Sequence, residues 1–169
     1  MDETSTDKAG DDYSRRLGGA ALGARLRRLS EAMDGDATRV YASLGINFEQ
    51  RWFGVLNQVA LNGPLTVGEL ASRLRITHVS VSQTRQSLEK AGLAVTQADP
   101  EDARRRRLTL TPAGEALVAQ LKPLWRAFEA AALEVNAEAL DVAAALDRLD
   151  DALARHPLHQ RILDRLGAQ

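Results

Sequence analysis

One short stretch of β character interrupts a sequence whose apolar residues otherwise recur at helical spacing. Residues 93–97 and 107–111 alternate apolar and polar side chains, and the charged, turn-rich residues 98–106 separate them. Two short helical segments precede this hairpin, and helical periodicity resumes after it. Two helices joined by a tight turn and followed by a hairpin are typical of a winged helix-turn-helix. The sequence therefore predicts a mostly α fold with a minor β part, built around that motif.

Capping signals divide the predicted motif into three helices. The expected N-caps are Asn47, Thr66 and Thr77, and the expected helix ends are Gly63 and Gly92. Thr66 and Glu69 follow the capping-box pattern T-x-x-E, in which each residue bonds the backbone of the other. In the third helix, Val81 and Leu88 lie seven residues apart and are expected to face the core.

Helical stripes flank the motif on both sides. Residues 14–46 are expected to form one long N-terminal helix, bent at Gly35, and residues 112–169 are expected to form C-terminal helices. Apolar residues between 117 and 135 recur close to the 3.5-residue spacing of paired helices. The sequence thus predicts four divisions: a disordered acidic tail (1–13), an N-terminal dimerisation helix (14–46), the winged helix-turn-helix (47–111) and C-terminal dimerisation helices (112–169).

The positive charge of the chain is local. The net charge is −1, yet residues 64–111 carry eight basic against five acidic residues. Because a protein binds the nucleic-acid backbone through its basic groups, any contact with DNA is expected in this region.

Several classes of function are excluded by what the sequence lacks. Without cysteine there is no disulfide framework, iron–sulfur cluster or thiol nucleophile. His156 and His159 would share a helix face, but a zinc site needs further ligands, so no metal or cofactor is expected. No phosphate-binding glycine loop or G-x-S-x-G motif is present, and an enzyme is not expected. The acidic N-terminus has no secretory signal and no apolar run could span a membrane, which favours a cytoplasmic protein.

A spaced pattern in residues 102–114 carries the most specific signal. It reads D-x-R-x-x-x-apolar-x-L-T-x-x-G, with Asp102, Arg104, Leu108, Leu110, Thr111 and Gly114 at the defined positions. This pattern resembles the wing of the MarR family of transcriptional regulators, and residues 76–93 resemble the recognition helix and its exit. The resemblance implies a homodimer on a pseudo-palindromic operator, usually a repressor, and often one that a small ligand releases from DNA.

The face of the third helix opposite Val81 and Leu88 is expected to meet the bases of double-stranded DNA. Gln83 could pair with adenine through two hydrogen bonds, and Val79 could contact a thymine methyl group. The alternative is an ordinary solvated helix face. The candidate DNA-binding residues of this helix are Thr77, His78, Val79, Ser80, Ser82, Gln83 and Gln86.

Four consecutive arginines, Arg104 to Arg107, lie at the tip and second strand of the predicted hairpin. Such runs are usually only solvated. By resemblance, Arg104 matches the arginine that the family inserts into the minor groove, where negative potential is concentrated. Arg105 and Arg106 are expected to contact phosphates, Arg107 to lie on the strand, and Asp102 to orient Arg104 through a charge-assisted hydrogen bond.

Two further predictions concern partners. Trp52 and Trp125 could line the cleft in which the family binds small effectors, although plain core packing would use tryptophan equally well. Winged helices also serve as protein–protein modules without direct DNA readout. The arginine run favours DNA, because unpaired cations suit phosphates better than a desolvated protein interface.

Overall fold

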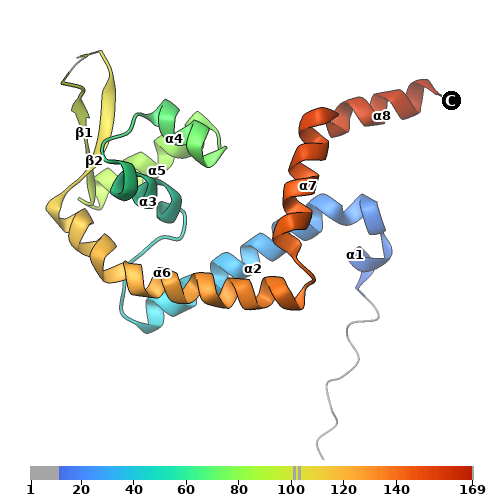
Figure 1. Ribbon diagram of the computed structural model, residues 1–169, viewed down its shortest axis with the longest axis horizontal. Coiled ribbons are helices and arrows are strands. Elements are labelled where there is room, and N and C mark those ends of the chain that lie inside the picture. Colours follow the sequence, from blue (N-terminus) through green and yellow to red (C-terminus); the bar gives the residue numbers. More distant parts are fainter. Residues whose placement is uncertain (1–11, 101, 103, 169) are drawn as a thin grey trace, which may run out of the picture. The chain divides into compact units, whose positions relative to one another are not determined.

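The computed structural model describes residues 12–100, 102 and 104–168, and the chain divides into two compact units, Met1–Val118 and Ala119–Gln169. The elements of the first unit are α1 (Tyr13–Arg16), the 3₁₀ helix η1 (Gly18–Ala21), α2 (Leu22–Ser43), α3 (Trp52–Asn62), α4 (Val67–Leu74), α5 (His78–Lys90), β1 (Ala94–Ala98) and β2 (Arg106–Leu110). Helix α6 (Pro112–Glu138) runs from the first unit into the second, which also contains α7 (Val142–Arg155) and α8 (Leu158–Gly167) (Figure 1).

The N-terminal segment is helical but not continuous. Asp12 accepts a hydrogen bond from the Ser14 backbone and caps α1, so order begins within the range predicted to be a disordered tail; residues 1–11 lie outside the described part. The single helix expected over residues 14–46 is interrupted at Gly18, whose φ of 53° is left-handed. After that break α2 runs through Gly35 and ends at Ser43.

The predicted N-cap at Asn47 is wrong, because the next helix begins only at Trp52. The intervening segment is held by an aromatic side chain instead. Phe48 is buried, with its ring centroid 4.7 Å from that of Tyr41 and 5.7 Å from that of Trp52, edge to face. Packing this ring between two helices fixes residues 46–51 in a non-helical connection, and it outweighs the local preference of asparagine for a cap.

Helices α3, α4 and α5 pack together and against the hairpin, as a winged helix-turn-helix requires (Figure 1). Leu56, Leu70, Val81 and Leu88 are fully buried between them. Both predicted caps are present. The Glu69 backbone donates to Thr66 Oγ1 over 3.1 Å and the Thr66 backbone to Glu69 Oε2 over 2.7 Å, while the Ser80 backbone donates to Thr77 Oγ1 over 3.1 Å. The predicted ends at Gly63 and Gly92 are confirmed by φ angles of 75° and 71°.

The two strands pair antiparallel, with Ala94 opposite Leu110 and Thr96 opposite Leu108. Residues that face each other across strands share one face of the sheet. The buried Leu108 therefore places Ala94 and Thr96 on the inner face, and Ala94 is only 3% exposed. Val95, which lies between these two residues, is exposed.

Helix α6 begins at Pro112, the predicted start of the C-terminal helices, and Thr111 caps it. The Gly114 backbone donates to Thr111 Oγ1 over 3.1 Å, and the Thr111 hydroxyl donates to the Gly92 carbonyl over 2.7 Å. The helix start is thereby tied to the end of α5. Among the described residues, no helix is both long enough and apolar enough to cross a membrane.

Candidate nucleic-acid interface

The residues predicted to contact bases lie on the outer, largely solvent-exposed face of α5. Thr77, His78, Val79, Ser80, Gln83 and Gln86 are exposed, and Ser82 is half-buried. Val79 is 66% exposed, although it is apolar. The capping hydrogen bond of Thr77 starts the helix within this set, so the free N–H groups and the positive dipole end lie beside the exposed residues.

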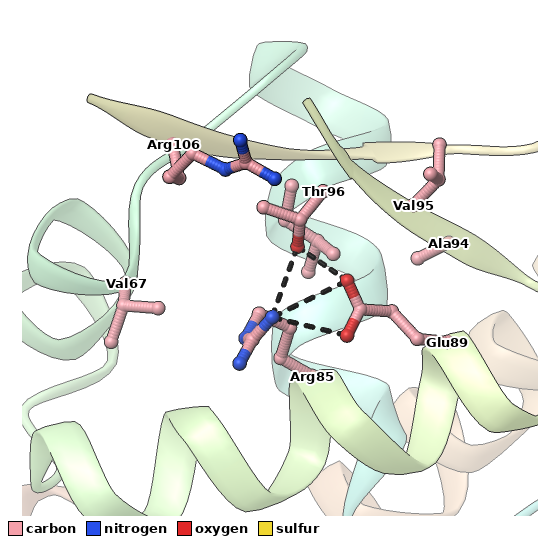
Figure 2. A pocket seen from close by; sticks show the side chains of 8 residues that line it. Val67, Arg85, Glu89, Ala94, Val95, Thr96 and Arg106 are labelled. Carbon is pink, nitrogen blue, oxygen red and sulfur yellow. Dashed lines mark hydrogen bonds and ion pairs between the residues drawn. The ribbon is translucent and has the colours of Figure 1, made fainter. Parts of the chain in front are cut away.

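The inner face of α5 is fixed by packing and by an ionic cluster. Val81, Thr84 and Leu88 are buried. Arg85 Nη1 lies 3.1 Å from Glu89 Oε2 and donates to Thr96 Oγ1 over 3.2 Å, and the Thr96 hydroxyl also bonds Glu89 (Figure 2). Since Thr96 belongs to β1, this cluster joins α5 to the hairpin.

The wing tip is shaped by backbone hydrogen bonds. The Arg104 N–H donates to Asp102 Oδ1 over 3.0 Å, the Arg105 N–H to the Asp102 carbonyl over 2.8 Å, and the Asp99 N–H to the Arg105 carbonyl over 2.9 Å. Asp102 thus holds Arg104 through its backbone, where sequence reasoning expected a bond to the guanidinium. Arg104, Arg105 and Arg106 are all exposed.

Arg107 lies on β2 as expected, but its role was not foreseen. Its Nε lies 2.5 Å from Asp99 Oδ2, and its Nη1 donates to the Pro64 carbonyl over 3.0 Å and lies 3.9 Å from Glu69 Oε2. Asp99 is only 6% exposed. The last of the four arginines therefore clamps the wing to the start of α4, while the first three remain at the surface. In the sequence, only its position on the strand distinguishes Arg107 from the three arginines before it, so its structural role has a weak sequence signal.

Glu69 connects the capping box to the wing. The Thr66 backbone hydrogen bond, then the Thr66 hydroxyl, and more weakly the charges of Arg107 and Arg105 hold the pKa of Glu69 below its ordinary value of 4.5. Arg105 Nη2 lies 3.7 Å from Glu69 Oε1. A carboxylate that stays ionised beside two wing arginines partly offsets their charge.

A cavity of about 520 Å³ opens between α5 and the wing strands. Arg85, Glu89 and Thr96 lie on one side of it, and Arg106 extends from β2 toward the same space (Figure 2). Arg85 Nε is buried there without a hydrogen-bond partner among the described residues. The cavity therefore presents two guanidinium groups against one carboxylate.

The two predicted cleft residues have different surroundings. Trp52 is 3% exposed, and its indole N–H donates to Ser87 Oγ over 2.9 Å. It belongs to the core of the first unit and also borders a hollow beside α5. Trp125 lies half-buried on α6, in the second unit. A ligand cleft that uses both tryptophans stays a prediction.

Comparison with known proteins shows what this chain is similar to. Residues 44–105 match the sequence model of the MarR family. The chain is similar to the S. aureus MepR–DNA complex structure, with 25% identity and a TM-score of 0.63 over 78% of this chain and 97% of that one. It is similar to a MarR family regulator from Silicibacter pomeroyi, with 25% identity and a TM-score of 0.56 over 79% and 88%.

A third solved structure shares the fold. It is that of Bordetella bronchiseptica BpsR, a protein whose DNA binding is regulated by 6-hydroxynicotinic acid. The two chains are 22% identical, with a TM-score of 0.63 over 77% of this chain and 93% of BpsR. No curated protein sequence matches the chain.

Proposed function

We propose that the protein is a transcriptional regulator of the MarR kind, whose sequence model matches residues 44–105, and that it represses transcription by binding a specific operator in double-stranded DNA. One observation carries the proposal. An exposed helix face with polar, hydrogen-bonding side chains lies on the same small module as a hairpin whose tip carries three exposed arginines. The helix suits a major groove and the arginines suit phosphates or a minor groove.

Selection of bound sequences from a random duplex pool tests this function. The expected result is a pseudo-palindrome with half-sites about one helical turn apart. Retention on random duplex DNA should also fall steeply as salt is raised, because each neutralised phosphate releases counterions. A protein–protein module would show neither selection nor salt-sensitive retention, and that outcome would remove the proposal.

Substitution of single wing arginines tests which of them reach DNA. Arg104→Ala is expected to weaken operator binding by about 1–3 kcal/mol in an anisotropy titration at fixed salt. Arg105→Ala should cost less, because Glu69 already offsets part of the Arg105 charge. Arg104→Lys serves as the matched control: it keeps the charge but loses the planar fork, so its loss should fall between the wild type and the alanine variant. An Arg104→Ala variant with unchanged affinity would exclude this contact.

The proposed operator symmetry requires a homodimer. Helices α7 and α8 support one, because they expose apolar side chains at helical spacing, among them Leu146, Leu153, Leu158, Ile162 and Leu166. Light scattering after size exclusion is expected to give twice the monomer mass. Leu146→Glu with Leu153→Glu should shift the equilibrium to monomer and reduce operator affinity together, while a monomeric wild type would contradict the dimer.

We place the proposed effector site in the cavity lined by Arg85 and Arg106. Two guanidinium groups facing one carboxylate favour a small organic anion, and BpsR provides a precedent for regulation by an aromatic acid. An anion held by Arg106 would compete with DNA phosphate for the same side chain. Titration of aromatic carboxylates, with 6-hydroxynicotinic acid among them, should raise the Kd for operator in the wild type and not in Arg85→Leu. If no carboxylate changes the Kd, this site is wrong, whereas operator binding itself is unaffected by that result.

A further inference from the structure

Ser87 lies on α5 between its exposed and buried faces, and its hydroxyl is fully used inside the protein. It accepts hydrogen bonds from Trp52 Nε1 over 2.9 Å and from Arg51 Nη2 over 3.1 Å, and it donates to Glu49 Oε1 over 3.3 Å. A serine hydroxyl has one donor and two acceptor positions. All three are occupied, so this side chain is a junction rather than a solvated polar group.

The partners of Ser87 come from one short segment, residues 49–52, in which Trp52 is the buried member. Arg51 Nε donates to Glu49 Oε2 over 2.5 Å, and the two side chains are 57% and 44% exposed. Trp52 is 3% exposed in the core of the module. Because Trp52 is anchored by its burial, its hydrogen bond to Ser87 restrains α5 and does not simply follow the helix when it moves; the exposed Arg51 and Glu49 add less.

The restraint continues to the end of α2. Trp52 packs edge to face on Phe48, and Phe48 packs on Tyr41, which is 1% exposed in the last turn of α2. A continuous series of contacts therefore runs from α2 through residues 48–52 to the last turn of α5. Close-packed aromatic rings transmit small displacements because they leave no free volume to absorb them.

We infer that Ser87 is a positioning residue for sequence readout, which fixes the rotation of α5 and so aims Gln83 and Gln86 at the bases; this inference rests on the proposed DNA-binding function. Gln83 lies one helical turn before Ser87, Gln86 is its direct neighbour, and both border the same hollow as Ser87 and Arg51. Productive contacts of this kind tolerate errors of only about 0.5 Å. A small rotation of α5 would misplace both amides.

The role predicts a split between two kinds of DNA binding. Binding to random duplexes depends on phosphate contacts, which the wing arginines supply without Ser87. Selection of the operator depends on base-edge contacts from α5. Loss of the junction should therefore reduce discrimination and leave the affinity for random DNA nearly unchanged.

The test compares Ser87→Ala with Ser87→Thr, which keeps the hydroxyl. Dissociation constants are measured at one salt concentration for the selected operator and for a random duplex of equal length. The specificity ratio is the Kd for the random duplex divided by the Kd for the operator. In Ser87→Ala this ratio is expected to fall about tenfold, which is the value of one good base contact. The affinity for the random duplex should stay within about twofold of wild type. Ser87→Thr should recover most of the ratio, and Trp52→Phe should resemble Ser87→Ala.

Three outcomes separate the possibilities. An unchanged ratio in Ser87→Ala, beside a wild type that selects an operator, overturns the positioning role and leaves the proposed function intact. Equal losses on both duplexes with a lower Tm show a merely structural serine and overturn it as well. A wild type without salt-sensitive DNA binding rejects the proposed function and this inference with it.

Fluorescence gives a readout that general destabilisation would not imitate. The chain has two tryptophans, so Trp125→Phe leaves Trp52 as the only emitter. In that background, Ser87→Ala removes the acceptor of the Trp52 N–H and should shift the emission maximum of the folded protein, while Ser87→Thr should not. Identical spectra for all three folded proteins would contradict the hydrogen bond on which the inference depends.

Discussion

Arg107 Nε lies 2.5 Å from Asp99 Oδ2, an ion pair that ties the second strand of the wing to the residue directly after the first. Asp99 is buried, whereas the Arg107 side chain keeps 27% of its exposure. Removing one member of such a pair leaves a charge without compensation in a poorly solvated place. The Arg107–Asp99 ion pair should therefore contribute more to the stability of the fold than the side chains of Arg104, Arg105 and Arg106 do.

Arg107→Ala is accordingly expected to lower the free energy of unfolding by about 2 kcal/mol, less than for a fully buried pair because the arginine is partly solvated. Urea denaturation measures it. Arg104→Ala is the matched control from the same run and should change stability by less than about 0.5 kcal/mol. Equal stabilities for the two variants would show that the clamp contributes nothing.

Gly114 is expected to tolerate no side chain. A Cβ at this position would lie 2.0 Å from the Leu93 carbonyl oxygen, so the start of α6 could not stay against the end of α5. Gly114→Ala should destabilise the protein by about 3 kcal/mol or more, as overpacking against backbone does. Gly23→Ala is the control, because nothing lies within 4 Å of its Cβ and alanine is the better helix former. Thermal unfolding of the two variants should move in opposite directions.

The motif was predictable from sequence because its signals are local. Thr66, Thr77 and Gly63 act through bonds or dihedral angles within their own helix ends, and each was found where its type predicts. The outward face of α5 followed from the spacing of Val81 and Leu88 in the same way.

Two of the failures come from packing between elements, which the local pattern of a single helix or strand does not show. Asn47 lost its capping role because Phe48 is buried between Tyr41 and Trp52. The alternation in residues 93–97 does not give the buried face of β1, because cross-strand pairing with Leu108 and Leu110 decides it. Long-range pairs such as Trp52 with Ser87, 35 positions apart, leave no periodic trace in the sequence.

The capping box predicts a pH dependence of stability. The pKa of Glu69 is lower in the folded protein than its ordinary 4.5, so ionised Glu69 stabilises the fold above about pH 4.5 and this contribution is lost as the pH falls through the folded-state pKa. Glu69→Gln keeps a hydrogen-bonding group but removes the titration. Urea titrations from pH 7 to pH 3 should show wild type losing stability relative to Glu69→Gln below about pH 4.5. A constant difference across this range would contradict the sign.

Replacing both members of the Arg85–Glu89 pair should cost less stability than the two single replacements together. Both side chains are about three-quarters buried, at 26% and 28% exposure, and they share Thr96 of the wing. Arg85→Leu alone leaves the Glu89 carboxylate without its cation in a partly buried site. Glu89→Leu alone likewise leaves the Arg85 guanidinium without its anion. Each single variant is expected to lose about 1–2 kcal/mol of stability, since an orphaned partner keeps its desolvation cost.

In the double variant both charges are gone and two apolar side chains can pack between α5 and the wing. Replacement of a whole buried pair by apolar residues is often neutral or stabilising. The double variant should therefore be more stable than the sum of the single losses predicts, by about 1–2 kcal/mol in a double-mutant cycle. Strictly additive losses would mean that Arg85 and Glu89 contribute to stability independently, and that their ion pair does not help to hold α5 against β1.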